Sequence, residues 1–422
     1  MISEVPTGPS GKLALILIAY HDGSDNIASQ RFRGLLRYLP REHYTVQVFS
    51  GPLQRPEGAP SHEVTYLDAP LLSQAKFGAR IAVLGKVFRM VAFQSDLNSD
   101  ESWIAQVVAA ARARVRSELD AGNRVVVMAT YSPVDALIAA RLIAVEERVP
   151  LIQDFRDGLF HESLGREGIF YSTLRRFVEA WAVRPAACIT SVTRPLVKYF
   201  KTTYPYVTTA LLYNGFDSAE FGTSMSDHCN IAKSTAGDPA LGHFGRISAS
   251  EAARFRTFEK LISYLEGGPF NGSLIFYGQL TEMEVGALSR AMLNVEINGQ
   301  VSRHKSLDAM KSMDALLVIT GESEGVATGK IFEYLFSGRR IVLVTLQRNE
   351  AARMLEEICD DDLILDFSDP STIPAIADFE RHLRRPFTRN YDRIAKFEKA
   401  AQAEELAVIL QSAALTQKGA AQ

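Results

Sequence analysis

The sequence has only three cysteines, Cys188, Cys229 and Cys359, among its 422 residues. They are far apart and odd in number, which excludes a disulfide framework, offers no zinc-ligand spacing and suits a reducing compartment. Neither charge is in clear excess, since the sequence contains 46 Lys and Arg and 49 Asp and Glu. A general nucleic-acid binder would show a basic excess. No uncharged apolar run reaches 18 residues, and the first one, 13–20, has no basic segment before it. The sequence therefore predicts a cytoplasmic protein without a membrane span or signal peptide.

Two well-known phosphate-binding loops are also missing. The Walker A motif needs four residues between its glycines and a hydroxyl residue after its lysine. Here three residues separate Gly325 from Gly329, and Ile331 follows Lys330. The pattern G-x-G-x-x-G occurs nowhere, and YHDGSD at 20–25 follows the first apolar run. These absences argue against a P-loop nucleotide hydrolase and against a nicotinamide or flavin dinucleotide-binding protein.

What is present is an alternation of short, β-branched runs with longer amphipathic stretches, interrupted by one polar segment at 214–239 that is typical of a domain linker. Strands are expected at 13–20, 45–50, 63–67, 124–129, 149–154, 187–192 and 208–213, then at 240–245, 273–278, 314–319, 340–345 and 363–367. Helices are expected at 29–39, 102–119, 133–146 and 166–183, then at 251–266, 282–293, 329–337, 349–358, 371–384 and 391–415. This order predicts an α/β fold with two Rossmann-like, doubly wound domains facing a central cleft. The expected boundaries are 1–213, 214–390 and a final helix and tail at 391–422. Ligands of such sheets bind beyond the carboxyl ends of the strands, so the loops after strands are the candidate sites.

The richest of these loops lies in DALLVITGESEGVATGKIFEYLFSGRR at 314–340, where a strand leads through a polar, glycine-containing loop into a helix. Free backbone N–H groups at the start of that helix, together with Lys330, make an anion site suited to a diphosphate. Glu333 lies one turn inside the helix, where its carboxylate can accept hydrogen bonds from two vicinal hydroxyls, as on a ribose. The alternative is an ordinary strand–loop–helix in which Lys330 and Glu333 form a solvated i,i+3 pair. The residues alone favour neither interpretation.

Other strand-end loops of the second domain carry candidates as well. Gly245 and Arg246 follow its first strand, with Arg254 and Arg256 downstream, and guanidinium groups match phosphate oxygens. The alternative for each arginine is that it is simply solvated at the surface. This alternative is weakest for Arg246, which directly follows an apolar strand. After the next strand comes the Tyr277-Gly278 turn, where a glycine permits close backbone approach to a ligand. A third loop, NGQVSRHK at 298–305, precedes a helix and either contacts a base through its backbone groups or is an ordinary loop.

In their order and spacing these motifs resemble those of GT-B-fold glycosyltransferases, and the chain is similar to the retaining group known as glycosyltransferase family four. The matching motifs are Gly23 after the first strand, VPLIQDFRDGL at 149–159, NGFD at 214–217, Gly245-Arg246, and TGKIFEYLFSGRRI at 328–341. The resemblance covers roughly residues 13 to 410, and it implies that the final helix at 391–422 returns to the first domain. It implies transfer of a sugar from a nucleoside diphosphate sugar to an acceptor hydroxyl, with retention of configuration, in polysaccharide or glycoconjugate biosynthesis.

The resemblance also implies roles for the residues. Glu333 would hold the ribose hydroxyls, and Gly23 would approach the donor phosphates. The diphosphate would be held by Gly245, Arg246, one of Arg254 and Arg256, and the helix start at Thr328, Gly329 and Lys330, with Tyr277 and Gly278 nearby. Arg246 and Lys330 would stabilise the leaving diphosphate without a metal, and no Asp-x-Asp metal motif occurs in a strand-end loop. The chain departs from the family at Gly325, which stands eight positions before Glu333 in place of a glutamate; the nearest carboxylate is Glu324.

The first domain would hold the acceptor, a saccharide or a lipid-linked sugar. Arg156, in the position of a histidine frequent in the family, and Asp157 would position the sugar or acceptor. Alternatively, Asp157 pairs with Arg156 or caps a helix. His21 and Asp22 are candidates for a contact with the donor phosphates, and Arg31 is a candidate for binding an anionic acceptor. The alternatives are a structural role for His21 and a solvated helix face for Arg31.

One segment bears on partners. Residues 71–94 carry four basic and no acidic side chains, with an apolar stripe at helical spacing. Such a helix either rests on an anionic membrane surface as a peripheral contact or packs on its own domain. Two other functions stay open: a GT-B nucleotide-sugar epimerase, and a catalytically degenerate glycosyltransferase acting as a partner subunit.

Overall fold

A computed structural model of the chain describes residues 11–23, 27–53, 62–71, 101–160, 169–222, 237–248, 251–325, 329–359 and 361–419. The chain divides into two units, one made of residues 1–213 with 402–422 and the other of residues 214–401. The helix expected at 71–94 lies outside the described residues, except for Leu71. None of the described helices is long and apolar enough to cross a bilayer.

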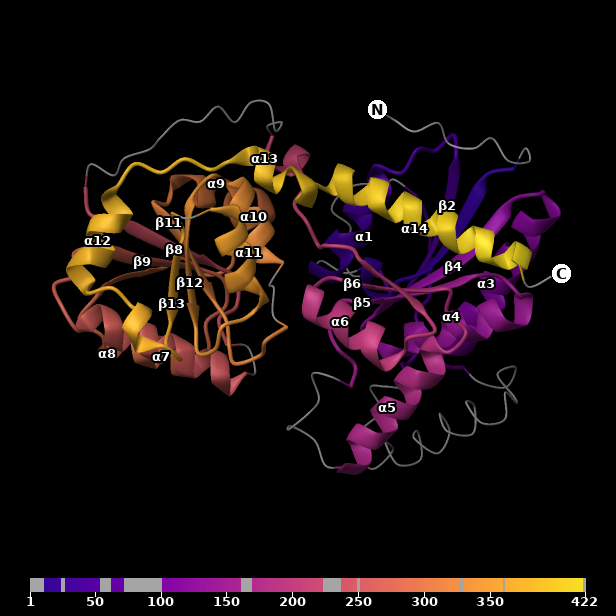
Figure 1. Ribbon diagram of the computed structural model, residues 1–422, viewed down its shortest axis with the longest axis horizontal. Coiled ribbons are helices and arrows are strands. Elements are labelled where there is room, and N and C mark those ends of the chain that lie inside the picture. Colours follow the sequence, from indigo (N-terminus) through magenta and orange to yellow (C-terminus); the bar gives the residue numbers. More distant parts are fainter. Residues whose placement is uncertain are drawn as a thin grey trace. The chain divides into compact units, whose positions relative to one another are not determined.

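The first unit contains a seven-stranded, entirely parallel sheet in the order β3-β2-β1-β4-β5-β6-β7. Figure 1 labels β2, β4, β5 and β6 among its strands. Its strands are β1 Leu13–Ile18, β2 Tyr44–Ser50, β3 Glu63–Tyr66, β4 Arg124–Tyr131, β5 Leu151–Phe155, β6 Cys188–Ser191 and β7 Thr208–Leu211. The strand order reverses direction between β1 and β4. In a doubly wound sheet, this switch point is where the loops diverge and leave room for a ligand.

The second unit repeats the plan with six parallel strands in the order β10-β9-β8-β11-β12-β13. These are β8 Ala240–Phe244, β9 Ser273–Tyr277, β10 Asn294–Ile297, β11 Ala315–Ile319, β12 Arg340–Thr345 and β13 Leu363–Asp366. Its switch point lies between β8 and β11. Strand β10 was not expected from the sequence, because it is a short, mostly exposed edge strand without an apolar run.

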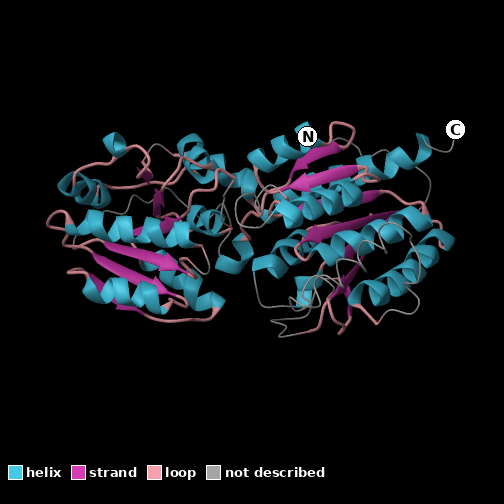
Figure 2. Ribbon diagram, turned by 90° about the horizontal axis from the view of Figure 1, so that it is seen from below, coloured by secondary structure: helices cyan, strands magenta, loops and turns pink. Residues whose placement is uncertain are grey.

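Helices cover the faces of both sheets, as a second view shows (Figure 2). In the first unit they are α1 Ile27–Arg37, α3 Trp103–Asp120, α4 Val134–Glu147, α5 Ile169–Val183 and α6 Arg194–Thr203, with η1 Tyr20–Gly23 after β1. In the second they are α7 Ala252–Glu266, α8 Glu282–Arg290, α9 Arg303–Ser312, α10 Lys330–Phe336, α11 Glu350–Ile358, α12 Ile376–Arg384 and α13 Tyr391–Ile394, with η4 Ser218–Phe221. The last helix, α14 Lys399–Gly419, begins in the second unit and continues into the first. Helix α6 was not predicted from the sequence.

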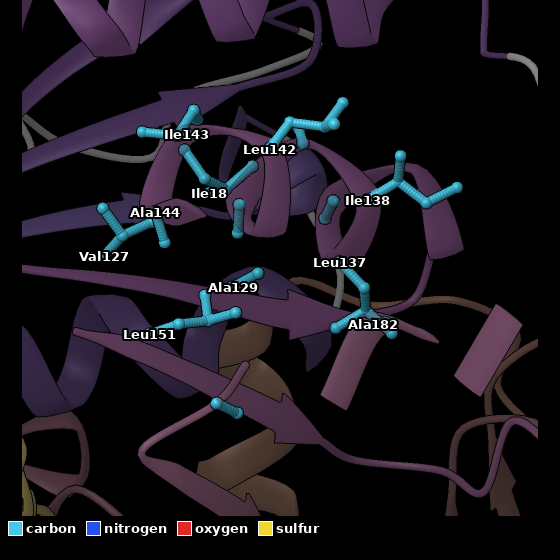
Figure 3. Packing of buried hydrophobic residues seen from close by; sticks show 14 of the residues in the cluster. Ile18, Val127, Ala129, Leu137, Ile138, Leu142, Ile143, Ala144, Leu151 and Ala182 are labelled. Carbon is cyan, nitrogen blue, oxygen red and sulfur yellow. The ribbon is translucent and has the colours of Figure 1, made fainter. Parts of the chain in front are cut away.

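The core of the first unit is built by alternation along its strands. Leu13, Leu15 and Leu17 of β1 pack against α1 and α14, whereas the intervening Ala14, Ile16 and Ile18 pack against α3 and α4. A strand buried on both faces needs apolar residues at every position, which explains the continuous run in the sequence. Figure 3 shows Leu137, Ile138, Leu142 and Ile143 of α4 gathered with Ile18, Val127, Ala129 and Leu151 of the sheet.

The polar segment 214–239 is only partly a linker. Phe216 is buried, its ring stacks on Phe336 at a centroid distance of 4.6 Å, and its N–H donates to the carbonyl of Phe397 over 3.0 Å. Asp217 then caps η4 by accepting from Ala219. Residues 214–222 are therefore a packed part of the second unit.

Candidate functional site

The loops at the carboxyl edge of the second sheet are packed so closely that glycine is required. Gly245, Gly278 and Gly299, after β8, β9 and β10, have φ angles of +94°, +139° and +65°. A Cβ at Gly278 would lie 2.6 Å from the carbonyl oxygen of Gly245, and the Gly278 N–H donates to Gly299 over 2.7 Å. Gly278, expected to allow the approach of a ligand, thus allows the approach of a neighbouring loop.

Lys330 lies against the first of these loops. Its Nζ donates to the carbonyl of Arg246 over 3.0 Å, and a Cβ at Gly245 would come within 2.9 Å of that Nζ. Burial lowers the pKa of Lys330 to about 8; the charge of Arg254 lowers it further and that of Glu333 opposes the shift. A cationic group held without a fully compensating carboxylate is suited to an anionic ligand.

His243, a residue of β8, lies against the same loop. Its Nδ1 lies 3.0 Å from the carbonyl of Leu317 and its Nε2 lies 3.4 Å from that of Arg246. Burial lowers the pKa of His243 to about 3, with Lys330 adding to the effect, so the imidazole is neutral at physiological pH. His243 was not singled out from the sequence, because a histidine within an apolar strand gives no sign of what its ring contacts.

The two candidate arginines of the following helix lie in different surroundings. Arg254 is close enough to Lys330 and His243 to lower the pKa of both, and it pairs with Glu251. Arg256 forms an ion pair of 2.6 Å with Glu322 in which both side chains are about half exposed. Of the two, Arg254 is therefore the one whose charge acts on Lys330.

Glu333 lies one helical turn beyond Lys330, and its partner is Arg303 of α9. The Nη2 of Arg303 donates to Oε1 of Glu333 over 2.9 Å, while its Nε donates to Oε2 of Glu220 over 2.7 Å. Burial of Arg303 is outweighed by these two carboxylates, which raise its pKa. Arg303 lies in the segment 298–305, but its role was not predicted, because its partners lie 30 and 83 residues away and no local spacing connects them.

The remaining candidates of this unit are placed as follows. Tyr277 stacks on Phe244 with a centroid distance of 4.8 Å and parallel rings. Glu324 forms an exposed ion pair with Arg353 at 2.7 Å. Gly329 is the N-cap of α10. Thr328 lies outside the described residues.

At the carboxyl edge of the first sheet, the structure brings His21 and Arg156 together. Arg156 follows β5, and its Nε donates to the carbonyl of Tyr131, at the end of β4, over 2.9 Å. Burial lowers the pKa of His21, and the charge of Arg156 lowers it further. Asp157 is exposed, and Gly23 ends the short helix η1 that carries His21. These residues border the switch point of the first sheet.

Arg31 and Asp22, expected on the acceptor side, are instead buried. Arg31 donates through Nη2 to Asp154 and to the carbonyl of Leu212, each over 2.9 Å. Asp154 also accepts from the hydroxyls of Thr130 and Thr190 over 2.8 and 2.7 Å. The solvated helix face considered for Arg31 is therefore wrong, and its guanidinium belongs to a hydrogen-bonded hub inside the unit.

The charged side chains that face Asp22 from the described residues are distant. Its Oδ2 lies 3.8 Å from Nε of Arg33 and 3.8 Å from Nε2 of His62. Among the described residues, no group of three or more His, Cys, Asp or Glu side chains is arranged to hold a metal ion. The metal-independent reaction expected from the sequence stays a prediction.

Two parallel, doubly wound sheets of matching strand order, with helices between their strands, define a two-domain Rossmann-like fold of the GT-B type. No protein-family profile and no curated protein sequence matches the chain. Solved structures do. A sucrose-phosphate synthase from Thermosynechococcus elongatus is 16% identical with a TM-score of 0.63, covering 97% of this chain and 100% of the other.

The Anabaena protein HepE, solved in complex with UDP-glucose, is also 16% identical, with a TM-score of 0.60 over 94% of this chain and 99% of its own. A glycosyltransferase from Rickettsia africae is 9% identical, with a TM-score of 0.57 over 96% and 98%. At such identities the likeness establishes the fold. Membership of the retaining family four group, expected from the motifs, rests on the sequence resemblance.

Proposed function

We propose that the protein is a glycosyltransferase that moves a sugar from a nucleoside diphosphate sugar to an acceptor hydroxyl. The observation that carries the proposal is Lys330 at the β8–β11 switch point, bonded to the loop of Arg246 and near the charge of Arg254, with Glu333 one turn further along α10. The half-buried ammonium of Lys330 can bind the oxygens of a diphosphate, and the carboxylate of Glu333 can accept hydrogen bonds from the hydroxyls of a ribose. Structures of HepE, which has this fold, contain UDP and UDP-glucose.

Catalysis in this proposal is electrostatic. Cleavage of the bond between the sugar and the diphosphate leaves negative charge on the departing phosphate oxygens. Positive groups fixed beforehand around those oxygens stabilise the transition state more than the substrate, and this lowers the barrier. Lys330 and the guanidiniums of Arg246 and Arg254 would supply this charge without a metal. Retention of the anomeric configuration is proposed on the motif resemblance alone.

The first unit would receive the acceptor. His21 and Arg156 are the polar pair at the carboxyl edge of its sheet, and we place the acceptor hydroxyl or the sugar beside them, with Asp157 exposed next to Arg156. A lipid-linked acceptor, reached through the basic segment 71–94 at a membrane surface, would fit a role in polysaccharide or glycoconjugate biosynthesis.

One observation favours a second candidate, a degenerate glycosyltransferase that serves as a partner subunit. Gly325 stands where the family places its first glutamate, and the adjacent Glu324 is occupied by Arg353. Incubation with nucleotide sugars separates these functions. A glycosyltransferase forms a glycoside with an acceptor, an epimerase forms a free sugar or an epimer without one, and a partner subunit forms no product.

Nucleotide binding is the first test. A thermal-shift screen with UDP, GDP, ADP and dTDP and their sugars should reveal a ligand, because binding to the folded state raises its apparent stability. The variant Glu333→Ala should then weaken binding of that nucleotide by about 10-fold or more, since a hydrogen bond to a charged group contributes roughly 1.5–3 kcal/mol.

The matched control is Glu322→Ala, which removes a carboxylate of the exposed ion pair with Arg256 and should change the affinity less than twofold. Unchanged affinity in Glu333→Ala would contradict the ribose role of Glu333. A wild-type protein that is stabilised by none of these nucleotides would contradict the proposed function itself.

A further inference from the structure

Arg303 is shared by two carboxylates, and the sharing is unequal. Both Nε and Nη2 of Arg303 donate to Oε2 of Glu220, whereas Glu333 receives one hydrogen bond, from Nη2 to Oε1, over 2.9 Å. The three side chains are partly buried, with exposed fractions of 27% for Arg303, 26% for Glu220 and 16% for Glu333. A guanidinium has a rigid, planar set of donors, so its orientation fixes the carboxylates that it contacts.

The geometry leaves one oxygen of Glu333 available. Within the described part of the chain, Oε1 is bonded to Arg303 and no hydrogen bond is made to Oε2. A carboxylate oxygen can accept two hydrogen bonds, so Oε2 has the capacity for two vicinal hydroxyls. If Arg303 paired with Glu333 alone, its planar fork could engage both oxygens. The two hydrogen bonds to Glu220 hold the guanidinium against Glu220 instead.

We propose that Arg303 is a positioning residue that holds the Glu333 carboxylate with Oε2 turned to the ribose, and that Glu220 keeps Arg303 from capturing that oxygen. This inference rests on the proposed function, because it takes Glu333 as the ribose-binding group. It assigns to α9 and η4 a role in recognising the ribose of the donor. The two helices are separate in sequence from the loop that holds the diphosphate, and the Nζ of Lys311 in α9 also donates to the carbonyl of Phe221, at the end of η4, over 3.0 Å.

The test compares nucleoside diphosphates with their 2′-deoxy counterparts. For UDP, GDP and ADP, the affinity of the full-length protein for the ribose form and the deoxyribose form is measured by calorimetry, and their ratio reports the contact between Glu333 and the 2′-hydroxyl. Wild-type protein should prefer the ribose form of its nucleotide by about 10-fold, corresponding to about 1.4 kcal/mol. Glu333→Ala should reduce this ratio to near 1.

Arg303→Met, which keeps the length of the side chain, should reduce the ratio to within about threefold of the value for Glu333→Ala. Arg303→Lys should restore part of it, because an ammonium can still hold Oε1. The double variant Arg303→Met/Glu333→Ala should match Glu333→Ala, because Arg303 acts through Glu333. Glu220→Ala, which removes the acceptor oxygen altogether, should also lower the ratio, since it frees Arg303 to engage both oxygens of Glu333.

The control is Arg381→Met, which removes an arginine of an exposed ion pair with Asp378 on α12 and should keep the wild-type ratio. Because the ratio is formed within each variant, a general loss of stability does not imitate the effect. Arg303→Met with a wild-type ratio, while Glu333→Ala loses it, would overturn the role of Arg303 and leave the proposed function standing. A wild-type protein that binds no nucleoside diphosphate would overturn both.

Discussion

Lys330 shows how a single side chain can make nucleotide binding depend on pH. Its pKa, lowered to about 8 chiefly by burial, lies below the ordinary value of 10.5. The ammonium is therefore charged below pH 8 and increasingly neutral above it. Since a diphosphate stabilises the charged form, its binding should draw a proton onto Lys330 near pH 8.

We expect the affinity for the nucleoside diphosphate to fall as the pH rises from 7 to 9.5, by up to about 10-fold per pH unit once Lys330 is largely neutral in the free protein. Calorimetry in buffers of different ionisation enthalpy should detect proton uptake at pH 8. Lys330→Arg keeps its charge throughout this range and should show neither effect. A wild-type affinity that is constant between pH 7 and 9.5 would contradict a direct contact between Lys330 and the diphosphate.

At the residue scale, the sequence predicted what is local and missed what is distant. The placement of Gly245, Arg246 and Lys330 at the end of an apolar strand or at the start of a helix could be predicted from the local pattern, whereas their binding roles stay predictions. Arg303 and His243 could not, since their contacts depend on how strands and helices far apart in sequence are brought together. Arg31 was misjudged for the same reason, because its buried partner Asp154 lies 123 residues away.

At the scale of elements, the hub around Asp154 connects α1 to the centre of the first sheet. Arg31 comes from α1, Thr130 from β4 and Thr190 from β6, and all three donate to the Asp154 carboxylate of β5. A buried carboxylate that loses its cation is left with an uncompensated charge, which costs more than the loss of one hydrogen bond.

Arg31→Met should therefore lower the free energy of unfolding by about 3–5 kcal/mol, measured by urea denaturation. The double variant Arg31→Met/Asp154→Asn should recover part of the loss, because it removes the unpaired charge. Arg37→Met, at the exposed end of the same helix, should cost less than about 1 kcal/mol. A stable Arg31→Met protein with impaired acceptor binding would instead support the acceptor role that the sequence suggested.

The elements themselves were predicted where burial demands an apolar pattern. Strands β1, β4, β11 and β12 are buried along most of their length and read as continuous apolar runs. Strand β10 is a short, mostly exposed edge strand of the second sheet, so hydrophobic periodicity did not reveal it. Helix α9 was expected only as the helix after the loop 298–305, and in the structure it begins inside that segment, at Arg303.

At the scale of the whole molecule, α14 returns the chain to the unit in which it began. Leu406 and Leu410 of this helix are fully buried with Leu13, Leu15 and Leu17 of β1, although nearly 400 residues separate them in sequence. The first unit therefore lacks part of one core layer until the last helix has been synthesised. The family resemblance implied this return of the final helix. The domain linker alone could not reveal it, because the linker marks only one of the two places where the chain passes between the units.

Leu410→Ala should lower the stability of the first unit by about 2–5 kcal/mol, since it leaves a cavity in a closed core. Both tryptophans, Trp103 and Trp181, lie in that unit, so their fluorescence during urea denaturation follows its unfolding separately from that of the second unit. Val408→Ala, at a position that is 63% exposed on the same helix, should shift the transition by less than about 0.5 kcal/mol.

Adding the nucleotide to the same denaturation experiment allows the unfolding of the second unit to be followed separately. Because the proposed donor site is built from residues of the second unit, saturating nucleotide should stabilise that unit by mass action, which circular dichroism would record as a later transition. In Leu410→Ala, the loss of tryptophan signal should then occur earlier while the nucleotide-protected transition stays in place. A single transition in which Leu410→Ala and the nucleotide shift both signals equally would show instead that the two units unfold as one cooperative body.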